Sequence, residues 1–172
     1  MERRQGGGVP FLVYEPRPHS MREVLAAGGR WTGRDHVVHR GRRMRFEEVV
    51  DAASRVAGHL TAEGVKPGDR VLLLGGNSIA WVVAFWAIVD AGAVIVLGNA
   101  WWNGPEVEHA VRLTEPRLTL APASLLERLP AGSIALDLDQ LELAGNAGTT
   151  PAGAPADSGG HPRGPRAPGD ED

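Results

Sequence analysis

The stretch from Arg70 to Leu138 constrains the fold most, because short apolar runs alternate there with segments of helical character. Arg70–Leu74 holds a continuous apolar run, as expected of a strand covered on both faces. Ala93–Leu97 is expected to be a second buried strand, and Arg117–Ala121 and Ile134–Leu138 follow as a third and a fourth. This alternation predicts an α/β fold with a parallel sheet between helices, a three-layer arrangement.

Helix boundaries are legible between these strands. Asn77 or Ser78 can cap the first helix, and Gly92 is placed to end it. Pro105 suits the first turn of the next helix because its missing N–H is not needed there. Helices are therefore expected over Ile79–Ala91, from Pro105 to about Leu113, and over Ala123–Leu129.

The N-terminal half is less regular. Residues 1–20 are expected to form an irregular lead-in, with at most a short strand at Phe11–Tyr14. The α/β domain is expected over residues 21–140, opening with a helix that Ser20 caps. A small hairpin and a longer amphipathic helix follow in this domain. These elements are predicted over Met21–Ala27, His36–His39 with Arg43–Arg45, and from Phe46 to about Glu63.

Composition excludes several classes of function. The formal net charge of −3 does not favour nucleic acid, and the absence of cysteine excludes disulfides and thiolate chemistry. The apolar segment Ile79–Val89 is short for a membrane span, and no apolar leader follows the N-terminus, so a cytoplasmic protein is expected. Residues 145–172 contain no large apolar side chain and predict a disordered Gly/Pro-rich tail.

No residue pattern predicts a metal site or a nucleophile. His36 and His39 are three residues apart on an expected strand, so they point to opposite faces, and no histidine pair has the spacing of a zinc motif. Ser78 lies between a strand and a helix, where a nucleophile can sit. The neighbours Gly76 and Asn77 favour helix capping instead.

Two short segments resemble phosphate loops by position or composition. Gly75-Gly76-Asn77 lies at the carboxyl end of a buried strand and begins a helix, but it lacks the glycine spacing and the lysine of nucleotide-binding loops. A tight strand-to-helix turn is the favoured interpretation. Gly148-Thr149-Thr150 has no strand before it and no lysine after it, so low complexity explains it better.

The tryptophan pair after the second strand is the best local indication of a ligand. Trp81, Phe85 and Trp86 are expected to pack in the core. Two consecutive tryptophans in a loop cannot both be buried easily, so either Trp101 or Trp102 is expected to line a cleft or a contact surface.

Six segments carry recognisable motifs in order along the chain: Arg43–Glu48, Gly64–Val71, Asn77 with Ser78, Trp81–Gly92, Ala93–Val96, and Asn99–Trp102 with Pro105 and Glu106. Together they resemble the N-terminal part of the adenylate-forming superfamily, which includes AMP-binding acyl-CoA synthetases, firefly luciferase and peptide-synthetase adenylation domains. The resemblance is specific because the matches are collinear over roughly residues 10–138. Arg45 replaces the threonine with which the family normally caps the helix that follows.

This resemblance implies a two-step reaction. A carboxylate attacks ATP to give an acyl-adenylate and pyrophosphate, and the thiol of CoA then displaces AMP to give a thioester. Mg²⁺ accompanies the ATP. The family's Ser/Thr/Gly phosphate loop and its lysine lie beyond the matched stretch, so we assign no catalytic, cofactor-binding or metal residue to this chain; Trp101 and Trp102 are the only candidates for substrate binding.

Two explanations for the missing motifs stay open. The chain is expected to be a truncated or frameshifted ligase product, inactive alone, with a genuine short protein as the alternative. As a function from a different class, it could be a non-catalytic binding or interaction module that uses the sheet edge near Trp101 and Trp102. Apolar sheet surface that a complete enzyme would cover predicts self-association.

Overall fold

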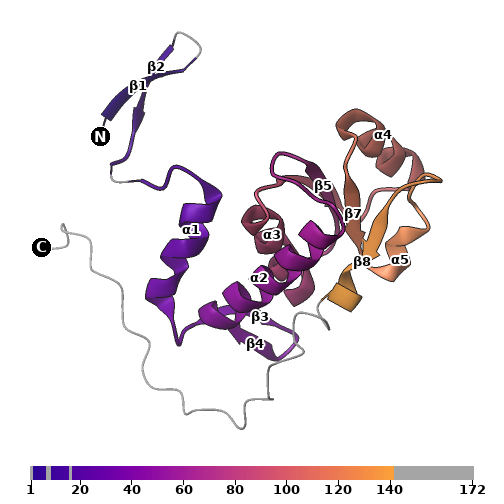
Figure 1. The fold of residues 1–172 in the computed structure, drawn as a ribbon, viewed down its shortest axis with the longest axis horizontal. Coiled ribbons are helices and arrows are strands. Elements are labelled where there is room, and N and C mark those ends of the chain that lie inside the picture. The colour runs from indigo at the N-terminus through magenta and orange to yellow at the C-terminus, as the bar shows by residue number, and fades with distance from the viewer. Residues whose placement is uncertain (1, 7–8, 16, 142–172) are drawn as a thin grey trace, which may run out of the picture.

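A computed structural model of the chain describes residues 2–6, 9–15 and 17–141, and a four-stranded parallel sheet is its centre. The strand order is β6-β5-β7-β8, with all pairs parallel (Figure 1). The predicted parallel α/β core is confirmed. Its strands are β5 (Arg70–Gly75), β6 (Val94–Asn99), β7 (Leu118–Ala121) and β8 (Ala135–Asp137).

Helices cover both faces of this sheet and complete the three layers (Figure 1). Side chains alternate between the faces along β5, so Val71 and Leu73 pack with α2 and α3, while Leu72 and Leu74 pack with α4 and α5. The four helices are α2 (Phe46–Ala62), α3 (Ile79–Asp90), α4 (Gly104–Thr114) and α5 (Ala123–Leu126).

The strand β6 lies at an edge of the sheet, which corrects the expectation of a second buried strand. Among the described residues it pairs only with β5. Val94 and Leu97 are therefore 50% and 54% exposed. The apolar run indicated a strand, but strand order, which a sequence run does not encode, decided its burial.

Helix ends follow the predicted chemistry. Ser78 rather than Asn77 caps α3, its Oγ accepting from the Trp81 N–H at 3.0 Å. At the start of α2, Arg45 has no side-chain acceptor. The Glu48 carboxylate accepts from the Arg45 N–H at 2.6 Å, so half of a capping box persists without the family's threonine.

The N-terminal segment differs from the predicted irregular lead-in. Backbone pairing joins β1 (Glu2–Gly6) and β2 (Val9–Val13) in an antiparallel hairpin. The short strand expected at Phe11–Tyr14 matches part of β2, but the glycines and Pro10 concealed β1 and its pairing. The predicted tail, residues 145–172, lies outside the described residues.

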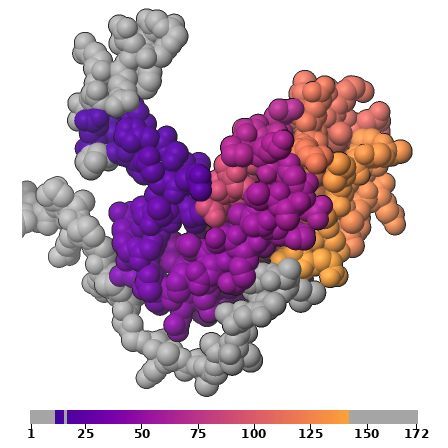
Figure 2. Space-filling model, viewed as in Figure 1, coloured from indigo at the N-terminus to yellow at the C-terminus, as the bar shows by residue number. Residues whose placement is uncertain are grey.

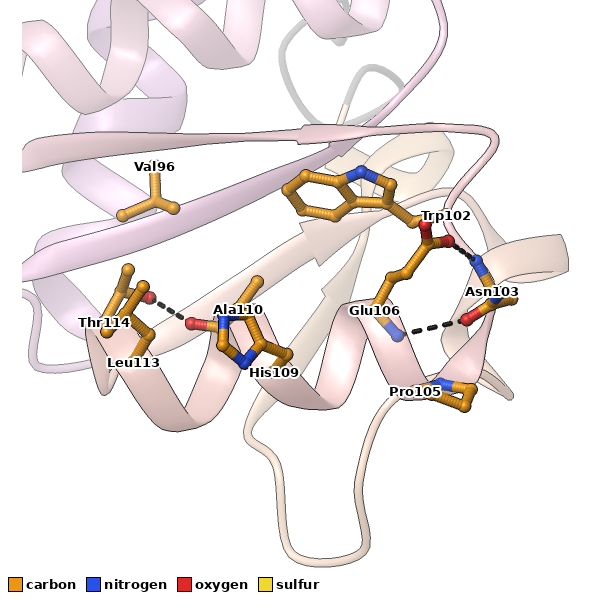
Figure 3. A pocket seen from close by; sticks show the side chains of 9 residues that line it. All are labelled: Val96, Trp102, Asn103, Pro105, Glu106, His109, Ala110, Leu113 and Thr114. Atoms are coloured by element: carbon orange, nitrogen blue, oxygen red, sulfur yellow. Dashed lines mark hydrogen bonds between the residues drawn. The ribbon is translucent and has the colours of Figure 1, made fainter.

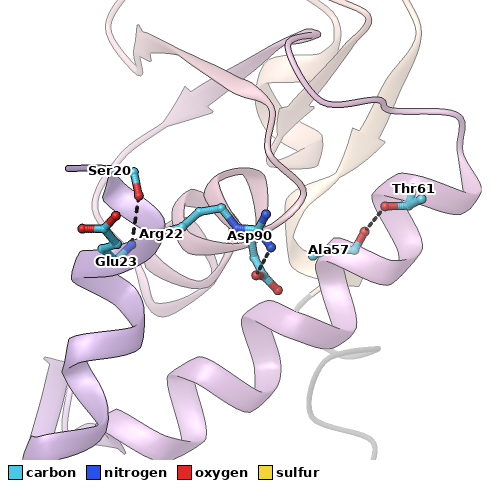
Figure 4. A network of polar contacts seen from close by, with 6 residues as sticks. All are labelled: Ser20, Arg22, Glu23, Ala57, Thr61 and Asp90. Atoms are coloured by element: carbon cyan, nitrogen blue, oxygen red, sulfur yellow. Dashed lines mark hydrogen bonds and ion pairs between the residues drawn. The ribbon is translucent and has the colours of Figure 1, made fainter. Parts of the chain in front are cut away.

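The helix α1 (Met21–Ala27) is confirmed but packs lightly. None of its residues is buried, and Figure 2 shows this segment standing out from the main body. Ser20 caps it, and Arg22 forms an ion pair with Asp90 at the end of α3, 3.3 Å apart (Figure 4). The predicted hairpin is also confirmed, because β3 (Asp35–His39) and β4 (Arg42–Arg45) pair antiparallel. A short 3-10 helix, η1 (Gly28–Trp31), precedes it.

Candidate functional site

The carboxyl ends of the parallel strands meet at one border of the sheet, where ligands bind in open α/β folds. Gly75 of β5 is in register with Asn99 of β6, and Ala121 of β7 with Asp137 of β8. The loops that follow these four residues therefore form a continuous rim. The rim includes three of the segments that the sequence singled out, at Gly75, Ser78 and the tryptophan pair. The fourth, Gly148-Thr149-Thr150, lies outside the described residues.

The loop after β5 is a close-packed turn. A Cβ atom added to Gly75 would lie 3.4 Å from Pro122 and 3.6 Å from Trp81, and one added to Gly76 would lie 3.9 Å from Ala100. The Ser78 hydroxyl is engaged in capping α3. These contacts describe the strand-to-helix turn that the sequence favoured over a phosphate loop.

The loop after β6, which we call the carboxyl-end turn (residues 99–103), is held by three sets of hydrogen bonds. The Asn99 side chain accepts from the Trp101 N–H, and the Asn99 carbonyl from the Trp102 N–H, both at 3.0 Å. Arg128 donates from Nη1 to the Ala100 carbonyl at 3.0 Å and to the Trp102 carbonyl at 2.7 Å. These bonds thus fix three carbonyls and two N–H groups of this short loop.

Sequence reasoning missed Arg128. It follows α5, more than twenty residues beyond the turn that it holds, and it is one of many arginines in the chain. No local pattern marks it. Only the adjacency of α5 to the end of β6 brings its guanidinium to these carbonyls.

The two tryptophans of the carboxyl-end turn differ in environment. Trp101 is 88% exposed, whereas Trp102 folds back over β6 and is half-buried. Gly98 makes this possible, because a Cβ atom there would lie 3.3 Å from the Trp102 ring and 2.9 Å from Leu74. Of the pair predicted to include one cleft residue, the structure places Trp102 in the wall of a groove.

That groove lies between β6 and α4 and has a volume of about 570 Å³. Figure 3 shows Trp102 at one end of it and Leu113 at the other. Its polar groups serve the helix itself. Asn103 and Glu106 form a reciprocal capping box, and Thr114 bonds the Ala110 carbonyl. His109 also lines the groove, and its Nδ1 lies 3.4 Å from Arg112 Nη2 on the same helix. The remaining lining residues are Val96, Trp102, Pro105, Ala110 and Leu113.

The most family-like motif lies at the opposite end of the strands. We call residues 64–70 the amino-end turn. Gly64 and Gly68 have φ angles of +86° and +87°, and the Gly68 N–H donates to the Gly92 carbonyl at 2.9 Å. Arg70 donates to the Thr114 and Glu115 carbonyls and closes the end of α4. This motif therefore organises the fold rather than contacting the carboxyl rim.

The histidines do not converge on a metal site. Among the described residues, no group of three or more His, Asp or Glu side chains is placed to hold an ion. His36 packs instead on Phe46, with ring centroids 4.4 Å apart, and near Trp86. Burial lowers the pKa of His36 below its ordinary value, and its Nδ1 has no partner within the described part of the chain.

Comparison with known proteins assigns this architecture. A family model described as AMP-binding enzyme matches residues 25–170. The chain belongs to the AMP-binding enzyme family. The match extends beyond residues 10–138, on which the resemblance of the motifs was based.

Individual AMP-binding proteins agree with this assignment. A feruloyl-CoA synthase from an Amycolatopsis species is 36% identical over 109 residues, which are 57% of this chain and 22% of the relative. The N-terminal domain of FACL13 from Mycobacterium tuberculosis has a TM-score of 0.67 at 24% identity, over 76% of this chain and 36% of that one.

A further solved structure, the O-succinylbenzoate coenzyme A synthetase of Bacillus subtilis in complex with AMP, has a TM-score of 0.64 at 23% identity, over 69% of this chain and 32% of that one. The fold is that of the N-terminal subdomains of adenylate-forming enzymes. The chain spans about a fifth of the length of the curated acyl-CoA ligases that it matches. No helix in the described ranges is long and apolar enough to cross a membrane.

Proposed function

We propose that this chain is the N-terminal part of an ATP-dependent acid–CoA ligase and does not form an acyl-adenylate by itself. The curated relatives that support this proposal include a feruloyl-CoA synthase and a medium-chain acyl-CoA ligase. In the proposed reaction, a carboxylate displaces pyrophosphate from ATP, and the CoA thiol then displaces AMP. A cytoplasmic location stays a prediction.

The position of Lys66 carries the proposal. It is the only lysine in the sequence, and adenylate formation in this family uses a lysine to stabilise the charge that develops. Lys66 lies in the amino-end turn, before β5, whose six residues separate it from the carboxyl rim by about 20 Å. The only lysine is thus at the wrong end of the strands for that role.

The polar groups of the carboxyl rim support the same conclusion. Ser78 caps α3, and the Asn99 side chain accepts from Trp101 within its own loop. Asn103 and Glu106 satisfy each other. These side chains stabilise the fold by bonding within it. We therefore propose that other residues of a ligase bind ATP, Mg²⁺ and CoA.

A pyrophosphate-exchange assay tests the proposal. The purified 172-residue chain is incubated with ATP, Mg²⁺, labelled pyrophosphate and either ferulate or octanoate. We expect no carboxylate-dependent exchange, and the Lys66→Met variant should behave identically. Exchange above the no-carboxylate control that Lys66→Met abolishes would show that the chain holds a complete site.

The groove beside Trp102 favours one alternative, a binding module without catalysis. Its volume and apolar lining suit an alkyl chain or an aromatic ring. Titration with decanoate, followed by tryptophan fluorescence, tests this function. Saturable quenching that is lost in Trp102→Leu but kept in Trp101→Leu, without pyrophosphate exchange, would favour a non-catalytic binding module over the N-terminal part of a ligase.

A further inference from the structure

Among the described residues, the edge strand β6 has backbone groups on its outer side that pair with no other strand. The Val94 N–H donates to the Asp69 carbonyl at 2.7 Å, toward β5. Because backbone groups alternate in direction along a parallel strand, those of Ile95 and Leu97 face away from the sheet. β6 contains no charged residue and no proline, the usual means by which edge strands avoid association.

The opposite edge of the same sheet is different. β8 is three residues long and ends at Asp137, so it offers little strand for pairing. Residues 145–172, which come later in the sequence than β8, contain no large apolar side chain. Residues 145–172 therefore contain no run of large apolar side chains that would match the β6 edge.

The surface beside β6 is complementary to itself. At the amino end of the strand, Val94 and Leu113 are 50% and 72% exposed. At the carboxyl end, on the same face of the sheet, Gly98 has no side chain, and the groove opens beside Trp102 (Figure 3). Two apolar protrusions and a recess thus lie at opposite ends of one strand.

We propose that a second copy of this chain pairs antiparallel along β6, about a two-fold axis at Val96. With this register, Ile95 of one copy faces Leu97 of the other, and the pair exchanges both backbone hydrogen bonds. The same axis brings Val94 opposite Gly98 of the other copy and Leu113 toward the Trp102 end of its groove. The result is a continuous sheet with α4 of both copies on one face, an isologous dimer.

Two variants test this dimer by sedimentation velocity over a dilution series. Leu97→Pro removes only an outward N–H, so the fold should keep its internal ladder while the pairing is lost. Leu113→Glu places a carboxylate toward the apolar groove twice per dimer and should weaken association by at least about tenfold. Val38→Glu, at a 53% exposed position on β3, is the matched control and should leave the dimer intact.

Hydrogen exchange adds a readout that nonspecific aggregation would not produce. In the wild-type dimer, the Ile95 and Leu97 amides should be protected, and in folded Leu113→Glu they should exchange freely. Circular dichroism checks that both variants fold. A monomeric wild-type chain throughout the series would overturn the proposal, as would wild-type association that Leu113→Glu leaves unchanged.

Discussion

The amino-end turn and the carboxyl-end turn lie at opposite ends of the same strands and are held by similar chemistry, yet they present different surfaces. In each, an arginine donates to two backbone carbonyls, Arg70 at one end and Arg128 at the other. The amino-end turn directs its contacts inward, with Val65 buried and Pro67 against Gly92. The carboxyl-end turn instead displays Trp101 to solvent.

This difference shows that a motif can be family-specific for structural reasons. The glycines of the amino-end turn are required by their positive φ angles, and its charged residues close helix and loop ends. The carboxyl-end turn is equally fixed, but its rigidity positions a ring beside a groove. Matched substitutions in the two turns should show which residues stabilise the fold and which only shape the surface.

Gly92→Ala should have the largest effect. Its φ of +75° is unfavourable for alanine, and the new Cβ would lie 3.3 Å from Pro67. We expect the free energy of unfolding to fall by about 2–3 kcal/mol, measured by urea denaturation. Gly58→Ala is the control, because Gly58 lies inside α2 and a Cβ atom added there has no neighbour within 4 Å. Its free energy of unfolding should rise by about 0.5–1 kcal/mol. Equal effects at the two positions would contradict this account of the amino-end turn.

The next largest difference is expected between Trp101 and Trp102, in the stability that each loses on substitution by alanine. Trp102→Ala removes a half-buried ring that packs over Gly98 and should cost about 2 kcal/mol. Trp101→Ala, at an 88% exposed position, should change stability by less than about 0.5 kcal/mol. Thermal unfolding of both variants measures this, and a comparable loss for Trp101 would mean that it packs against the protein in solution.

The two arginines provide a closer comparison. Arg128→Met removes donors to two carbonyls at a partly buried position and should cost about 1–2 kcal/mol, with faster exchange of the Trp102 amide. Arg70→Met removes the corresponding bonds at an exposed position and should cost less, about 0.5–1 kcal/mol. A larger loss for Arg70→Met than for Arg128→Met would contradict the view that partial burial makes the Arg128 bonds the stronger pair.

The smallest expected effect is a pH dependence of the free energy of unfolding that arises at His36, outside both turns. Because burial lowers the His36 pKa in the folded chain, the unfolded chain takes up a proton first as the pH falls. The stability that neutral His36 contributes should therefore be present in full above pH 6.5, the ordinary value, and be lost as the pH falls from there to the folded-state pKa. His36→Phe should flatten this dependence in thermal unfolding, and an unchanged slope in that variant would contradict the assignment to His36.

Most of the element boundaries could be predicted from sequence because they depend on local chemistry. Ser20, Ser78 and Pro105 mark helix starts, and Gly64 and Gly92 mark helix ends. The β1–β2 hairpin was missed because glycine and proline conceal its pattern. The candidate site was predicted only in part: the sequence located the tryptophan pair but could not distinguish Trp101 from Trp102.

The sequence by itself determined the parallel α/β class, the turns and the family resemblance, because these follow from periodicity, backbone chirality and motif order along the chain. Tertiary structure alone decided the strand order, and with it the exposure of β6, the reach of Arg128 to the carboxyl-end turn and the distance of Lys66 from the carboxyl rim. Each of these depends on which segments become neighbours in space. That is set by the packing of the whole sheet and its helices rather than by any local pattern.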